Sequence, residues 1–202
     1  MLTAPAGESL VNLFTFHAHD SLMAVFFGML WGIGGLTFGL SMRYLGVALG
    51  QSLALGTCAG LGTLLGPVFT GHGEKLTSAV IIGIIVTLVG ITIIGIAGGM
   101  KSASLSDEEK KKAVADFNFP KGIFVALLSG FMSACFAIGL EFGMPVAFSG
   151  VNPVFASLPA TFLVTFGGFI ICAGYCLWQN KRNHSWADYG KKDLYLNNLL
   201  FC

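Results

Sequence analysis

Charged residues are scarce in this chain. They make up 10% of its 202 residues, whereas an ordinary soluble domain carries about a quarter. With 54% apolar residues and so few charges, the chain cannot cover a water-facing surface. Its formal net charge is only +1, and no stripe of Lys and Arg is available to neutralise a phosphate backbone, which excludes a nucleic-acid partner. These shortages predict a membrane protein whose surroundings are a lipid bilayer.

Disulfide frameworks and catalytic motifs are also missing. Four of the five cysteines lie inside apolar segments and the fifth, Cys202, is the last residue, which is not the pattern of a disulfide-rich secreted domain. The sequence contains no nucleophile elbow, Walker loop, zinc pattern or paired carboxylates. We therefore expect no enzymatic activity, no cofactor and no metal site.

Long apolar runs are what the sequence does contain. A helix needs about 17 to 25 apolar residues to cross a hydrocarbon core roughly 30 Å thick. None of the runs shows strand alternation. The fold class predicted is therefore all-α, with residues 1–202 forming a single transmembrane domain of about five helices, a loop at 101–121 and a tail at 179–202. The five expected spans lie near residues 22–40, 45–69, 79–97, 122–142 and 158–178.

The basic residues predict the orientation of these spans. Cytoplasmic loops of membrane proteins carry an excess of Lys and Arg. In a five-span arrangement, ten of the eleven basic residues fall on one face, and Lys75 alone falls on the other. The N-terminus is therefore expected outside the cytoplasm, and the loop 101–121 and the tail 179–202 inside it.

One acidic side chain lies within the expected spans. Burying a carboxylate in a membrane is costly, so Glu141 is a candidate functional residue. Counted from Gly122, it lies about 28 Å along its span, close to the outer boundary. Two interpretations remain open: an interfacial carboxylate reached by water, or a proton-accepting group that opens to an outward cavity.

Two further side chains are candidates for a sugar path. Trp31 lies about 14 Å along the first span, although Trp normally favours interfaces. An aromatic face suits the C–H surface of a sugar, and polar side chains suit its hydroxyls. Gln51, roughly 9 Å into the second span, needs a partner in another helix, a ligand or water. Packing of Trp31 against glycine and interhelical hydrogen bonding of Gln51 are the alternatives.

Arg43 and Tyr44 stand at the expected cytoplasmic end of the first hairpin. A basic residue there commonly anchors topology, and a gating role for Arg43 or a place for Tyr44 in the substrate path is the alternative.

Seven glycine pairs spaced four apart predict close helix contacts. The pairs are Gly28/Gly32, Gly35/Gly39, Gly46/Gly50, Gly56/Gly60, Gly62/Gly66, Gly95/Gly99 and Gly139/Gly143.

Three stretches resemble one family. They are GMLWGIGGLTFGLSMRYLGVALGQSLALG (28–56), FNFPKGIFVALLSGFMSACFA (117–137) and VNPVFASLPATFLV (151–164). This pattern is similar to that of the L-rhamnose/proton symporters of the drug/metabolite transporter superfamily. The resemblance implies a ten-helix carrier that moves L-rhamnose, or a related deoxysugar, with a proton across the bacterial inner membrane.

Compared with that family, the chain is expected to begin after two helices and to stop before the last three. We therefore expect a fragment of the ten-helix fold, with association with the missing helices or homo-oligomerisation covering its remaining faces. The alternative function is that of a non-transporting membrane scaffold or assembly protein. A scaffold predicts no polar lining that converges on one cavity.

Overall fold

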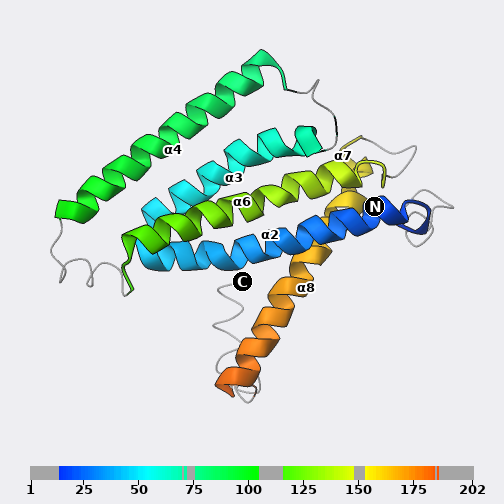
Figure 1. The fold of residues 1–202 in the computed structure, drawn as a ribbon. Helices are drawn as coiled ribbons and strands as arrows, with labels where there is room; N and C mark the ends of the chain where they lie inside the picture. The colour runs from blue at the N-terminus through cyan, green and yellow to red at the C-terminus, as the bar shows by residue number, and fades with distance from the viewer. Residues whose placement is uncertain are drawn as a thin grey trace.

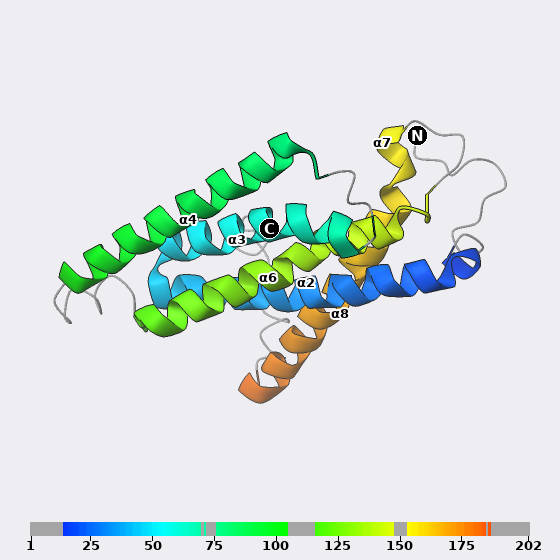
Figure 2. The same ribbon diagram turned by 45° about the horizontal axis from the view of Figure 1, so that its top comes forward.

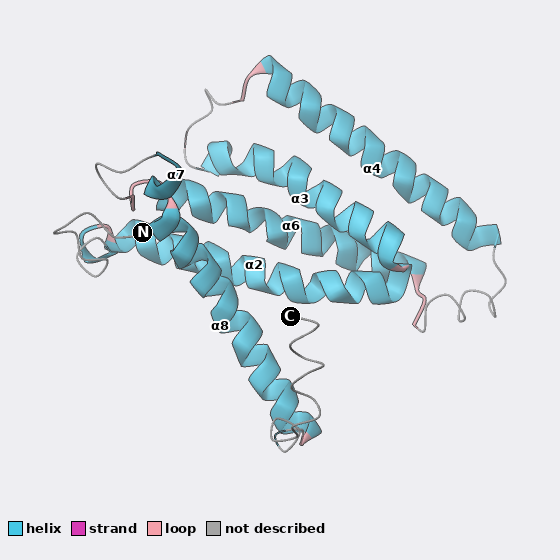
Figure 3. Cartoon of the chain, turned by 180° about the vertical axis from the view of Figure 1, so that it is seen from behind, coloured by secondary structure: helices cyan, strands magenta, loops and turns pink. Residues whose placement is uncertain are grey.

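The computed structural model describes residues 14–69, 71, 76–104, 116–147, 153–184 and 186. Within these ranges every regular element is a helix (Figure 3). Five of the helices are long and apolar enough to cross a membrane, which confirms the predicted polytopic helical fold. The helices are α2 (Ala18–Leu45), α3 (Val47–Phe69), α4 (Ser78–Ser104), α6 (Phe119–Gly143), the short α7 (Pro153–Ala156) and α8 (Leu158–Asn183).

Four of the five long helices extend beyond the apolar runs that predict them, whereas α3 begins two residues later than expected, at Val47. α2 begins at Ala18 rather than near residue 22, and Asp20 lies in its first turn, where the helix dipole favours a negative charge. α4 continues to Ser104, and α8 continues to Asn183 with Lys181 and Arg182 in its last turn. Parts of the expected loop 101–121 and tail 179–202 are therefore helical. Residues 105–115 and 187–202 lie outside the described part of the chain.

Local sequence sets several helix ends. Gly46 separates α2 from α3 and has a φ of 83°, a conformation that glycine adopts without steric cost. Its N–H donates to the carbonyl of Met42 at 2.9 Å. At the start of α6, the Asn118 side chain accepts a hydrogen bond from the Lys121 N–H at 3.2 Å, and Pro120 occupies the first turn. Both are typical features of a helix N-terminus.

α6 is the central helix of the bundle. It contacts α2 and α3 extensively and also touches α8, while α4 packs mainly on α3 (Figures 1 and 2). α8 crosses α2 near its own N-terminal half, and its C-terminal half diverges from the other helices (Figure 1). The order across the bundle is therefore α4, α3, α6 and α2, with α8 against α2.

Glycines make the crossing of α2 and α8 unusually close. A Cβ added at Gly28 would lie 2.1 Å from the carbonyl oxygen of Val164, and one added at Gly167 would lie 2.2 Å from that of Val25. The pair Gly28/Gly32 thus supports the predicted close helix contacts. In contrast, nothing lies within 4 Å of a Cβ added at Gly35 or Gly39, so this pair has the same spacing but no helix against it.

A buried hydrogen bond joins α2 to the central helix. The hydroxyl of Ser129, which is fully buried, donates to the carbonyl of Gly34 at 2.9 Å. A Cβ at Gly34 would lie 2.7 Å from the hydroxyl oxygen of Ser133. In lipid, where water cannot satisfy polar groups, such a bond between helices fixes their register.

Candidate functional site

A cleft of about 470 Å³ opens at one end of the bundle. The end of α3, the end of α6 and the starts of α4 and α8 meet there. We call it the Glu141 cleft, after its one acidic side chain. Its polar side chains are Thr63, Glu141, Ser157 and Thr161, and the rest of its lining is formed by Gly62, Gly66, Pro67, Val80, Ala137, Leu140, Met144 and Ala160.

Glu141 lies near the end of α6 and is half-buried. Glycines on α3 allow that helix to approach it, since a Cβ added at Gly66 would lie 3.3 Å from Cγ of Glu141. In the described part of the long helices, Asp20 in the first turn of α2 is the only other carboxylate. The structure therefore places Glu141 in the lining of a cleft at one end of the bundle.

Two threonines of the cleft donate their hydroxyl protons in hydrogen bonds to backbone carbonyls four residues earlier in the chain. Thr63 on α3 donates to the carbonyl of Ala59 at 2.8 Å, and Thr161 on α8 donates to the carbonyl of Ser157 at 3.1 Å. Sequence reasoning missed both residues. Threonine is common in membrane helices and bonds its own backbone readily, so no signal in the sequence distinguishes these two from the others.

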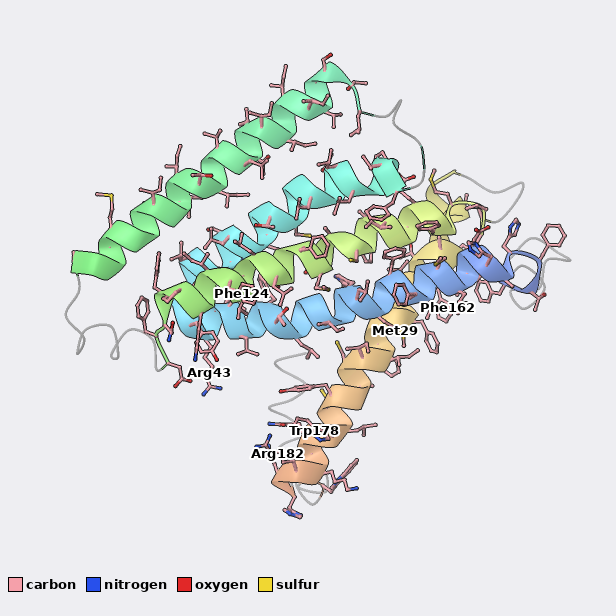
Figure 4. All side chains as sticks on the ribbon, viewed as in Figure 1. Met29, Arg43, Phe124, Phe162, Trp178 and Arg182 are labelled. Atoms are coloured by element: carbon pink, nitrogen blue, oxygen red, sulfur yellow. The ribbon has the colours of Figure 1, made fainter. Side chains whose placement is uncertain are left out.

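A second cleft, of about 510 Å³, lies at the opposite end of the bundle between the end of α2 and the start of α6. Tyr44 is one of its lining residues, together with Leu40, Pro120, Lys121, Phe124 and Val125. We call it the Tyr44 groove. Arg43 and Phe124 lie at this end in Figure 4, so Tyr44 and Glu141 occupy opposite ends of the helix bundle.

Arg43 forms an ion pair with Asp116 in the segment that precedes α6. Its Nε donates to a carboxylate oxygen, and next to this pair the Asn118 N–H donates to the carbonyl of Tyr44 at 3.2 Å. The side chain of Arg43 is 67% exposed and that of Asp116 is 44% exposed, and a solvent-exposed pair contributes only about 0–1 kcal/mol. The pair therefore ties two segments together at this end without a large effect on stability.

Trp31 packs between two other helices. Its ring centroid lies 5.0 Å from that of Phe136 on α6, and the absence of a side chain at Gly168 on α8 makes room for its six-membered ring. The side chain is half-buried. The structure thus shows the packing arrangement that the sequence offered as one alternative.

Gln51 is exposed on α3 and lies at a different level from Trp31. The neighbouring Gly50 packs against the backbone of Ser41 and Met42, and Ser41 is ten residues beyond Trp31 on α2. At 1.5 Å per residue, Trp31 and Gln51 are separated by roughly 15 Å along the bundle. Neither lines the Glu141 cleft or the Tyr44 groove.

Metal coordination finds no support among the described residues, where no cluster of three His, Cys, Asp or Glu side chains could hold an ion. His17 and His19 lie 3.7 Å and 3.3 Å from the carboxylate of Asp20. The thiol of Cys172 approaches the carbonyl of Gly32 at 3.9 Å, which is a contact between α8 and α2.

Comparison with known proteins decides the family. The sequence profile of the L-rhamnose-proton symport protein matches residues 10–202. The chain belongs to the L-rhamnose-proton symport family. The resemblance in the three sequence stretches is thereby confirmed, and the family is one of transporters.

Named relatives in this family come from several bacteria. An L-rhamnose-proton symporter of Mannheimia succiniciproducens is 33% identical over 176 residues, covering 82% of this chain and 50% of the relative. One from Escherichia coli is 32% identical over 195 residues, covering 90% of this chain and 55% of the relative. The chain thus spans about half the length of these relatives. No solved structure matches it.

Proposed function

We propose that this chain takes part in secondary active transport of L-rhamnose, or a related deoxysugar, coupled to proton symport. The observation that carries the proposal is the Glu141 cleft, in which a carboxylate from a membrane helix is combined with hydroxyl groups from two neighbouring helices. The family profile and the names of the relatives support this sugar and this coupling ion. The transported partners are then L-rhamnose and a proton.

In this proposal Glu141 is the proton-accepting group, because it is the acid that lies on a long helix away from the first turn of α2. Tyr44 belongs to the opposite end of the sugar path, where it lines its own groove. Trp31 and Gln51 line neither cleft, and in this proposal they contact the sugar between the two ends. Arg43, paired with Asp116, holds the end of α2 against the start of α6 and so gates or anchors that end.

The proposal is tested by uptake of radiolabelled L-rhamnose in cells that express the complete reading frame encoding this chain. We expect saturable uptake that a protonophore abolishes. Gln51→Ala and Trp31→Phe should each raise KM several-fold, because each removes a contact with the sugar. Thr92→Val, on an exposed position of α4, should leave KM unchanged.

Equal amounts of each variant in the membrane are the required control, since Trp31 also packs on Phe136. Uptake that is insensitive to the protonophore would refute proton coupling. A KM unchanged in both variants would assign Trp31 and Gln51 to helix packing alone.

We further propose that the protein lies in the bacterial inner membrane with its N-terminus outside and its C-terminus in the cytoplasm. The structure gathers Arg43, Lys101 and Lys121 at one end of the bundle: Asn118 bonds to Tyr44, and Gly99 faces the Phe119 ring. This clustering agrees with the rule that positive residues stay in the cytoplasm.

The orientation predicts the behaviour of reporter fusions. A fusion after Lys112 should be active with a cytoplasmic reporter and inactive with a periplasmic one, and a fusion after Gly71, between α3 and α4, should show the reverse. Both results follow from the ten-to-one distribution of basic residues. Periplasmic activity after Lys112 would show that the topology is inverted.

A further inference from the structure

We propose that Thr63, Glu141 and Thr161 form a hydrogen-bond-accepting subsite that binds the hydroxyl groups of a monosaccharide in the Glu141 cleft. The inference rests on the proposed transport function and assigns a place to the sugar. The three side chains come from α3, α6 and α8 and line one cleft. A ligand held by all three would therefore join helices that are separate in the sequence.

The hydrogen-bonding character of the subsite follows from its internal bonds. A hydroxyl group has one proton to donate and two lone pairs that accept. Because Thr63 donates to Ala59 and Thr161 donates to Ser157, their oxygens have only lone pairs left to offer a ligand in the cleft, and they act as acceptors. An ionised carboxylate at Glu141 is also an acceptor. The subsite thus requires a ligand that donates several hydrogen bonds, and sugar hydroxyls do so.

One side chain of the cleft can supply a complementary donor. Ser157 precedes α8 and makes no side-chain capping bond. Its hydroxyl can therefore turn toward a ligand and donate as well as accept. A sugar hydroxyl that donates to Thr161 could at the same time accept from Ser157, which is the paired arrangement that hydroxyl groups favour.

The remaining lining fits the apolar part of a deoxysugar. Val80 on α4, Leu140 on α6 and Met144 just after α6 lie in the same cleft as the three acceptors. A 6-deoxysugar carries a methyl group and a C–H face that such side chains can cover. The volume of about 470 Å³ falls within the range of roughly 300–1,000 Å³ usual for ligand sites.

Glycine and threonine have distinct parts in this arrangement. Gly62 and Gly66 line the cleft without side chains, and a Cβ added at Gly66 would lie 3.3 Å from Cγ of Glu141. The threonines contribute polar atoms that are not needed to hold the helices together, because both bond within their own helix. Replacing a threonine by valine should therefore change ligand binding more than folding.

The test is equilibrium binding of radiolabelled L-rhamnose to the full chain in lipid nanodiscs. Thr63→Val and Thr161→Val should each weaken binding about three- to tenfold, the effect of losing one hydrogen bond. Thr92→Val is the matched control, because Thr92 is exposed and donates to the carbonyl of Leu88 at 2.8 Å as Thr63 does to Ala59. It should bind L-rhamnose as tightly as the unmodified chain.

A second probe tests the acceptor character itself. Fully O-methylated L-rhamnose keeps the ring and its oxygens but has no hydroxyl to donate, so its binding should fall at least about tenfold. Binding of the methylated sugar as tight as that of L-rhamnose would overturn the acceptor subsite.

The outcomes separate the subsite from the proposed function. If the unmodified chain binds L-rhamnose and both cleft variants bind it equally well, the subsite is wrong and rhamnose recognition stands. If the chain binds a different monosaccharide and the cleft variants lose that binding, the subsite stands and the rhamnose assignment is wrong. If no monosaccharide binds, both are overturned.

Discussion

Replacing Glu141 with glutamine is expected to abolish gradient-driven accumulation of L-rhamnose while preserving exchange of the sugar. Binding should weaken by no more than about tenfold, because the amide oxygen still accepts a hydrogen bond although the charge is lost. The carboxamide has nearly the same size as the carboxyl group but cannot take up a proton. Each proton that crosses a potential of 100 mV supplies about 2.3 kcal/mol, which can support a roughly 50-fold sugar gradient. Without coupling, the internal sugar concentration should only equal the external one.

This result is measured in proteoliposomes by comparing uptake under an imposed proton gradient with counterflow of labelled sugar at equal pH. Asp20→Asn is the matched control, because Asp20 lies at the start of α2, does not line the Glu141 cleft and should retain full accumulation. Accumulation by Glu141→Gln as high as that of the unmodified protein would remove Glu141 from the coupling mechanism.

A single methyl group at the crossing of α2 and α8 is expected to destabilise the fold strongly. In Gly167→Ala, the new Cβ would lie 2.2 Å from the carbonyl oxygen of Val25 and 2.9 Å from the N–H nitrogen of Met29. Both atoms belong to helix backbone and cannot move away as a flexible side chain would. The helices must then separate, and overpacking of this kind costs about 1–3 kcal/mol or more.

The matched control for this variant is Gly35→Ala, also within a membrane helix, where nothing lies within 4 Å of the added Cβ. Alanine is favoured over glycine in a helix by up to about 1 kcal/mol, so this change should be neutral or stabilising. Unfolding in mixed micelles, followed by circular dichroism, compares the two. Equal stability of Gly167→Ala and Gly35→Ala would show that the crossing is looser than the structure indicates.

The five long helices could be predicted from the sequence because long apolar runs have few other stable structures in a membrane. Their ends were predicted less well. α2 includes His19 and Asp20, which a search for apolar runs excludes although the first turn of a helix tolerates them. Hydropathy thus identifies the part of a helix that lies in lipid, not the part that extends beyond it.

Helix pairing could not be predicted from glycine spacing. Gly28/Gly32 and Gly35/Gly39 lie on the same helix with the same separation, yet only the first pair has another helix against it. The candidate site was predicted in part: Glu141 was identified by its rarity, whereas Thr63 and Thr161 are ordinary residues brought beside it by packing. Such a site depends on contacts between distant segments, which local sequence patterns do not contain.

The central position of α6 has a consequence for the order of assembly during synthesis. α2 and α3 contact each other less than each contacts α6, and α6 follows both in the chain. A chain emerges from the ribosome N-terminus first. α2 and α3 therefore enter the bilayer before α6 and remain incompletely packed until residue 143 has been translated. The pair formed by α2 and α3 should therefore be most susceptible to proteolysis before α6 has been inserted.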